Sequence, residues 1–214
     1  MNMKTRVLLC VALLLIAAGM AGAQEPKPAT HTASAAKPKA AAPAMDPKAM
    51  EAMMEKMAAP GPNHEVFKGM EGEWNQTVVW TMDPSQPAQE SHSVATVKSI
   101  LGGRYSQEET TGEVMGKPFS GMGLVGYDNI LKKYVGMWVD NAGTGIMTEE
   151  GTADASGNVI NWIGKMSDPT TGKMGRSRMV WRKVDDNKHT FEMYSNGPDG
   201  KEFKMMTITY DRKM

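Results

Sequence analysis

Hydrophobic and polar residues alternate with a period of two over most of the chain from residue 72 onward. In the first stretch, the larger side chains stand at every second position: Trp74, Gln76, Val78, Trp80 and Met82. Successive side chains of a strand point to opposite faces, so this period is typical of a strand with one buried face. Similar runs follow over residues 90–101, 104–113, 119–127, 133–139, 145–152, 158–166, 176–184, 189–195 and 202–212. The pattern therefore predicts about ten strands.

Turn residues separate these runs, as in Asp83-Pro84-Ser85-Gln86-Pro87, Gly102-Gly103 and Asp154-Ala155-Ser156-Gly157-Asn158. Short turns of this kind join neighbouring antiparallel strands. No helical pattern long enough for a crossover lies between the runs, which excludes a parallel α/β sheet. Many short consecutive strands leave exposed edges that closure removes. The sequence predicts an all-β, up-and-down antiparallel barrel over residues 61–214, with a β-sandwich as the alternative.

A methionine-rich segment precedes this region. Asp46 and Pro47 are typical of a helix start, and Met50, Met53, Met54 and Met57 follow at the spacing of one helical face. We therefore expect a short amphipathic helix over residues 45–60. Thioethers are ligands that suit Cu(I), so copper handling is one hypothesis for this stripe. Without a neighbouring His or Cys, a packing role is the simpler interpretation.

The N-terminus has the features of a bacterial export signal. Lys4 and Arg6 precede an apolar run over residues 7–18, and Ala21-Gly22-Ala23 matches a signal peptidase site. We expect a signal peptide over residues 1–23, an exported protein that is periplasmic or secreted, and no membrane insertion after cleavage. Residues 24–44 are mostly Ala, Pro, Lys, Thr and Ser, which predicts a disordered linker.

Charge and cysteine content narrow the function classes. The chain has 24 basic and 24 acidic residues, and removal of Lys4 and Arg6 with the signal leaves a net charge of −2. This balance excludes a strongly basic nucleic-acid binder. The single cysteine, Cys10, lies in the signal, so neither a disulfide framework nor a cysteine zinc site is expected. We expect a small-molecule ligand and no nucleic-acid partner; the sequence does not indicate an oligomeric state.

The sequence has no recognisable catalytic or cofactor motif. There is no Gly-x-Ser-x-Gly, His-Glu-x-x-His or phosphate-loop sequence, which favours a protein that is not an enzyme and has no cofactor. The adjacent carboxylates Glu108-Glu109 and Glu149-Glu150 point to opposite faces of their strands, so neither pair is expected to form an acid–base site by itself. His189, followed by His64, is the best candidate for a haem ligand, but a surface turn residue is the simpler interpretation of His189.

The stretch 64–212 resembles the bacterial domain of unknown function family 1579. The matching pieces are Gly72-Glu73-Trp74, Ile100-Leu101-Gly102-Gly103-Arg104, Gly116-Lys117-Pro118-Phe119-Ser120-Gly121, Gly126-Tyr127-Asp128-Asn129, Trp138-Val139-Asp140, Asp168-Pro169-Thr170-Thr171-Gly172-Lys173 and Tyr210-Asp211-Arg212. The family has no established activity. A looser similarity to calycin barrels, such as lipocalins and nitrobindin-like proteins, implies that Arg212 stacks on Trp74 and that Gly72 allows a tight turn into the first strand. These three residues are then structural.

A barrel with clustered aromatic residues and no catalytic set predicts binding of a small, mostly apolar ligand. The candidate lining residues are Trp80, Trp138, Tyr127, Arg104, Asp140 and His189. The alternatives are an enzyme acting on a small cell-envelope substrate through Asp140 or Arg104, and Cu(I) handling by the methionine helix. No metal site is predicted apart from the methionine stripe.

Overall fold

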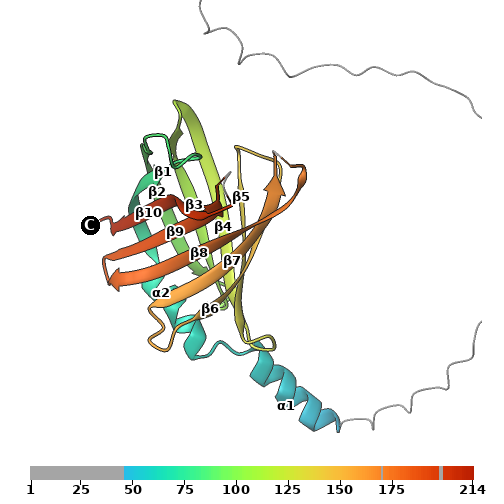
Figure 1. The fold of residues 1–214 in the computed structure, drawn as a ribbon. Helices are drawn as coiled ribbons and strands as arrows, with labels where there is room; N and C mark the ends of the chain where they lie inside the picture. The colour runs from blue at the N-terminus through green and yellow to red at the C-terminus, as the bar shows by residue number, and fades with distance from the viewer. Residues whose placement is uncertain (1–45, 170, 198–199) are drawn as a thin grey trace, which may run out of the picture. The chain divides into compact units, whose positions relative to one another are not determined.

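The computed structural model describes residues 46–169, 171–197 and 200–214, and in them ten antiparallel strands form one closed barrel (Figure 1). The strands are β1 (Gly72–Trp80), β2 (Gln89–Ile100), β3 (Tyr105–Val114), β4 (Lys117–Asp128), β5 (Lys133–Asp140), β6 (Met147–Ala153), β7 (Val159–Asp168), β8 (Lys173–Asp185), β9 (Lys188–Asn196) and β10 (Glu202–Arg212). Each strand pairs with the next, and β10 closes on β1. The predicted up-and-down barrel is confirmed, and the sandwich alternative is wrong.

Tight hairpins account for this strand order. Between β3 and β4, Met115 and Gly116 both have positive φ angles, of 54° and 73°. Two central residues with positive φ form a turn whose twist matches that of the flanking strands. The ladder therefore continues to the turn, where Val114 pairs with Lys117, and β4 begins two residues earlier than the sequence pattern predicts.

The methionine-rich segment forms helix α1 (Pro47–Ala58), with a proline in its first turn. Its C-terminal end is tied to the turn after β4, because the Asn129 side-chain amide donates to the carbonyl oxygens of Met57 at 2.8 Å and Ala59 at 2.9 Å. No residue of α1 is buried. The methionine stripe therefore does not serve as core packing in the described part of the chain.

Two short helices that the sequence pattern does not predict, η1 (Pro62–His64) and α2 (Glu65–Met70), cover one end of the barrel, here called the closed end. Phe67 of α2 is fully buried, and its ring packs edge-on against Tyr134 with the centroids 6.1 Å apart. The Trp74 indole N–H donates to the carbonyl oxygen of Met70 at 2.8 Å. A six-residue helix is too short to give a helical period, which is why the pattern misses it.

Buried inward side chains gather toward the closed end, whereas inward side chains toward the other end are partly exposed. Two core clusters of buried residues lie toward α2, and their members are Phe67, Tyr134, Met147, Ile160, Trp162, Met179, Trp181 and Met193, and Trp74, Ala95, Val97 and Tyr210. Toward the opposite end, Val78, Trp80, Ser91 and Phe119 continue the inward alternation but are only half-buried. Inward side chains in this half, here called the open half, are therefore partly exposed to solvent.

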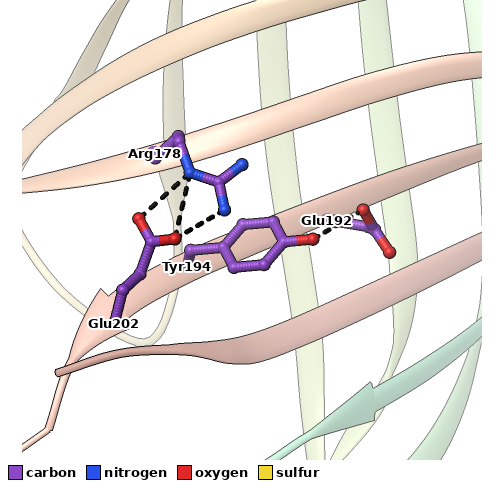
Figure 2. A network of polar contacts seen from close by, with 4 residues as sticks. All are labelled: Arg178, Glu192, Tyr194 and Glu202. Carbon is purple, nitrogen blue, oxygen red and sulfur yellow. Dashed lines mark hydrogen bonds and ion pairs between the residues drawn. The ribbon is translucent and has the colours of Figure 1, made fainter.

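The outer face of β8, β9 and β10 carries a polar network (Figure 2). The Arg178 guanidinium lies 3.6 Å from the Tyr194 ring centroid and pairs with Glu202 at 2.6 Å, while the Tyr194 hydroxyl donates to Glu192 at 2.9 Å. Exposed ion pairs of this kind contribute about 0–1 kcal/mol each. The network faces solvent, and we assign it a structural role.

The expected signal peptide (residues 1–23) and linker (residues 24–44) lie outside the described residues. Within the described ranges, the chain has no helix whose length and apolar character would let it cross a membrane.

Candidate functional site

Glu108 on β3 is the centre of a hydrogen-bond network inside the barrel. Its Oε1 atom accepts from the Gln76 amide at 3.0 Å, the Thr110 hydroxyl at 2.9 Å and the Tyr210 hydroxyl at 3.3 Å. Ser93 in turn donates to the Gln76 carbonyl oxygen and fixes the orientation of that amide. Side chains from β1, β2, β3 and β10 therefore hold this carboxyl group in place.

The second oxygen of Glu108, Oε2, has no hydrogen-bond donor among the described residues. In those same residues, every fully buried side-chain nitrogen or oxygen has a partner. An oxygen without a partner must therefore reach open space, and for an inward side chain that space is the lumen. One oxygen of Glu108 is held by the protein and the other is free to meet a ligand or water.

Glu149 on β6 is a second carboxyl that faces the lumen. Its neighbours across the sheet on the inner face are Gly136 and Gly164. A Cβ atom at Gly136 would lie 2.6 Å from Glu149 Oε1, so the carboxyl group leans over this glycine. Glu149 makes no hydrogen bond within the described residues, and its oxygens are open to the lumen by the same reasoning.

The two carboxyl groups influence each other electrostatically. Burial raises the pKa of Glu149 to about 7, and the nearby Glu108 carboxylate adds to this increase. Burial also raises the pKa of Glu108, against the effect of the donors Thr110, Tyr210 and Gln76, which stabilise its ionised form. Near neutral pH the pair therefore holds a proton that ordinary carboxylates would have lost. We call Glu108 and Glu149 the carboxyl pair.

Glycines and a tryptophan shape the wall beside Glu108. Gly123 on β4 pairs with Glu108 on one side and with Trp138 on the other. A Cβ atom at Gly121 would overlap the Trp138 indole, and one at Gly123 would lie 3.2 Å from it. The indole therefore lies against the bare backbone of β4. This arrangement places an apolar surface next to the carboxyl pair.

The closed end is fixed by Arg212 and Trp74, as the calycin resemblance implies. The guanidinium carbon of Arg212 lies 4.1 Å from the Trp74 ring centroid. Its N–H groups donate to the carbonyl oxygens of Glu71 at 2.6 Å, Gly69 at 3.0 Å and Asp186 at 3.0 Å. These contacts join the last strand to the first strand, to α2 and to the β8–β9 turn.

The model of a protein family of unknown function, DUF1579, matches residues 59–212 of this chain. The chain belongs to this family. No curated protein matches the sequence. The carboxyl pair, Trp138 and the Arg212–Trp74 contact all lie within the DUF1579 region.

A solved structure is similar to this DUF1579 barrel in fold. Rv2717c from M. tuberculosis has 14% sequence identity and a TM-score of 0.53, over 73% of this chain and all of that chain. A redesigned β-barrel also has 14% identity, with a TM-score of 0.38, over 69% of this chain and 95% of that chain. Only the first structure, with a TM-score above 0.5, bears on the protein, and at 14% identity it concerns the fold alone.

Of the candidate lining residues, two face the lumen of the DUF1579 barrel. Two others lie elsewhere, one packed into the closed end and one in a turn. Trp80 and Trp138 point inward and are half-buried. Tyr127 packs into the closed end, edge-on to Tyr134 at 5.0 Å. The assignment of Arg104 to the lumen is wrong, because this residue lies in the β2–β3 turn. Its guanidinium donates to the carbonyl oxygens of Leu101 and Ala58, both at 3.0 Å.

Asp140 lies on the same face as Trp138, but both of its carboxylate oxygens are engaged, which does not support the predicted role as an open interior base. Its carboxylate accepts from the Trp138 indole at 2.9 Å and from the backbone N–H of Ala142 at 3.0 Å, so it closes the end of β5. The interior carboxyl groups of the DUF1579 barrel are Glu108 and Glu149. Alternation does put each of them on the inner face, but only the closed register brings β3 and β6 around one lumen.

The interpretation of His189 as a surface turn residue is also wrong. Only 5% of its surface is exposed, and its ring stacks on Tyr210 at 4.1 Å and meets Trp74 edge-on at 4.4 Å. His64 is buried as well, and its Nδ1 accepts from the backbone N–H of Gly61 at 3.0 Å.

The described residues contain no cluster of three or more His, Cys, Asp or Glu side chains placed to hold an ion. The methionine candidates all lie on α1, where Met50, Met53 and Met54 are exposed and Met57 is half-buried. Cu(I) binding by this stripe stays a prediction.

Proposed function

We propose that this DUF1579 protein binds a small, mostly apolar ligand in the barrel lumen, and that the carboxyl pair bonds to a hydrogen-bond donor on that ligand. The observation that carries the proposal is the pair itself: two inward carboxyl groups from β3 and β6, each with an oxygen that no described residue satisfies. Amine, amide and hydroxyl groups are suitable donors. A ligand with a carboxylate at this point is disfavoured, because it would meet like charge.

The unpaired carboxyl oxygens favour a lumen that holds a hydrogen-bond donor over a lumen packed only with apolar side chains. A buried polar group without a partner costs about 1–3 kcal/mol, so the open oxygens need water or a ligand as donor. Gly121, Gly123 and Gly136 remove side chains from the wall where Trp138 and Glu149 lie. Known ligand sites combine apolar walls with a few placed polar groups, which is the composition of this lumen.

A fluorescent probe with both properties tests the proposal. N-phenyl-1-naphthylamine has two apolar ring systems and one N–H, and its emission rises when it leaves water. We expect saturable binding that weakens about tenfold in Glu149→Gln at pH 8, where the exchange replaces a carboxylate acceptor by an amide. Val78→Trp puts an indole into the open half of the lumen and should abolish binding.

Val79→Trp is the matched control, because residue 79 is next in β1 and faces outward. It should bind the probe like the wild type. Equal binding in the Val78→Trp and Val79→Trp variants, or no binding by the wild type, would overturn the proposal.

We further propose that the protein is exported before it binds this ligand. The basic residues, apolar run and small-residue cleavage site within residues 1–23 support this. Expression of the full chain in a bacterial host, followed by fractionation and N-terminal sequencing, tests it. A mature chain that begins at Gln24 outside the cytoplasm is the expected result, and an uncut cytoplasmic chain would contradict it.

A second candidate function is proton transfer, favoured by the pKa of Glu149 near 7. A carboxyl group in this range, beside a second carboxyl, is suited to act as a general base or acid. The probe 5-nitrobenzisoxazole tests the base directly, because its N–O bond breaks when a base removes the ring C–H proton. A rate that rises with an apparent pKa near 7 and is lost in Glu149→Gln would support catalysis. A rate equal to that of Glu149→Gln would exclude it.

A further inference from the structure

A cavity lies at the closed end, apart from the carboxyl pair. It has a volume of about 380 Å³ and opens between α2, the β6–β7 hairpin and the ends of β8 and β9. Its inner wall is aromatic and includes Trp74, Tyr134, Trp181 and His189. Neither Glu108 nor Glu149 lines it. The cavity is at the small end of the range of about 300–1,000 Å³ found for ligand pockets, so it suits a molecule of one or two rings.

His189 is the polar group of this cavity. Only 5% of its surface is exposed, yet no described residue forms a hydrogen bond with its ring nitrogens. Fully buried nitrogens without partners are absent from the described residues, so the nitrogens of His189 must reach open space. The cavity that it lines supplies this space.

The imidazole is held in a fixed orientation and is uncharged. Tyr210 stacks on it at 4.1 Å, and Trp74 and Trp181 meet it at 4.4 Å and 5.7 Å. Burial, with a further contribution from the positive charge of Arg212, lowers the pKa of His189 to about 3. A neutral imidazole keeps one nitrogen as a hydrogen-bond acceptor and one as a donor.

The charged groups at the rim select against anions. Glu65, Asp154 and Asp185 line the opening with one cation, Lys183. Lys183 is itself paired with Asp186, at 2.6 Å. A carboxylate or phosphate at the opening would meet an excess of negative charge, whereas a neutral or cationic molecule would not.

We propose that this closed-end cavity is a second binding site, for a small neutral or cationic aromatic molecule whose N–H or O–H group donates to His189 while its ring packs against Trp181. The site does not depend on the proposed lumen function, because the two share no lining residue. The donor satisfies a buried acceptor that the described chain leaves open, and the aromatic wall supplies apolar contact.

Binding of indole, measured by calorimetry and by the shifts of the His189 ring nitrogens in NMR, tests the proposal. We expect saturable binding that shifts the His189 nitrogens and weakens about tenfold or more in His189→Phe, which keeps an aromatic ring but removes the acceptor. Ala155→Trp, in the exposed hairpin at the rim, should block binding without touching the core. Benzamidine should bind and benzoate should not.

Glu149→Gln is the matched control, since it changes the lumen and leaves the closed end intact. It should leave the indole-induced shifts of the His189 ring nitrogens unchanged, and Ala155→Trp should still bind the naphthylamine probe. Equal indole affinity in the wild type, His189→Phe and Ala155→Trp would overturn the proposal. Absence of indole and benzamidine binding to the wild type at about 10 mM would overturn it as well.

Discussion

The guanidinium of Arg212 lies over the face of Trp74, 4.1 Å from its ring centroid, and thereby joins the last strand of the barrel to the first. Gly72 makes room for it. A Cβ atom at this position would lie 2.6 Å from Arg212 Nη1, and the glycine has a φ of 129° that other residues rarely adopt. The Arg212 side chain therefore reinforces the closure that the β1–β10 ladder makes.

Replacement of Arg212 by lysine should reduce stability. The lysine ammonium cannot stack on Trp74 as a planar group and cannot reach three separate carbonyl oxygens. We expect the free energy of unfolding to fall by about 2–4 kcal/mol in a urea titration. Arg178→Lys, on the exposed outer network, should cost less than about 1 kcal/mol. Equal losses in the two variants would show that Arg212 has no special role.

Glu149→Gln should stabilise the protein at alkaline pH. The folded-state pKa of about 7 is above the ordinary value of 4.5, so the folded protein binds more protons between these pH values. The free energy of unfolding therefore falls as pH rises from about 4.5 to 7. Glutamine carries no charge, so the variant should exceed the wild type by about 2–3 kcal/mol at pH 8 and by little at pH 4.5.

The control for this experiment is Glu150→Gln, the outward neighbour on the same strand, whose exposed carboxylate pairs with Lys133. We expect a change of less than about 1 kcal/mol at either pH. A Glu149→Gln effect that does not vary with pH would contradict the raised pKa.

Glu108→Gln should lower the pKa of Glu149. The negative charge of Glu108 contributes to the raised value, and glutamine removes that charge while keeping an oxygen that accepts from Thr110 and Tyr210. Because burial is the larger cause, we expect a titration midpoint between 4.5 and 7 in carboxyl carbon NMR. An unchanged midpoint would mean that the two groups are not coupled.

His189→Phe should change the response of the protein to acid. In the wild type the folded-state pKa of about 3 is below the ordinary value of 6.5, so the unfolded chain binds the additional proton. The free energy of unfolding thus falls as pH drops from about 6.5 toward 3. Relative to the variant, the wild type should lose roughly 1.4 kcal/mol per pH unit in this interval. Measurement in a Glu149→Gln background removes the opposing contribution of Glu149, and parallel pH curves would refute the prediction.

The sequence predicts the barrel well because alternation and turn chemistry are local properties. Each of the ten strands can be assigned from its own residues, and closure follows from the need to cover edges. Helix α2 is missed because two turns give no period. Arg104 is misplaced because two preceding glycines with positive φ turn the chain before β3 begins.

The carboxyl pair is missed for a different reason. Glu108 and Glu149 each look like half of an adjacent carboxylate pair, and alternation separates the members of each such pair. Their relationship depends on which strands surround the lumen and in what register. His189 is similarly uninformative in sequence, because only the closed barrel surrounds it with Trp74, Trp181 and Tyr210.

All three donors to Glu108 converge on a single oxygen, and this has a consequence for recognition. The direction in which the remaining oxygen points is set before any guest arrives, by side chains from three strands. A guest bound as proposed would therefore lose little free energy to the alignment of Glu108 Oε2. A molecule whose donor is placed differently would gain little, because this oxygen does not turn to meet it. If the lumen binds a ligand as proposed, its selectivity would follow from this fixed direction of Glu108 Oε2.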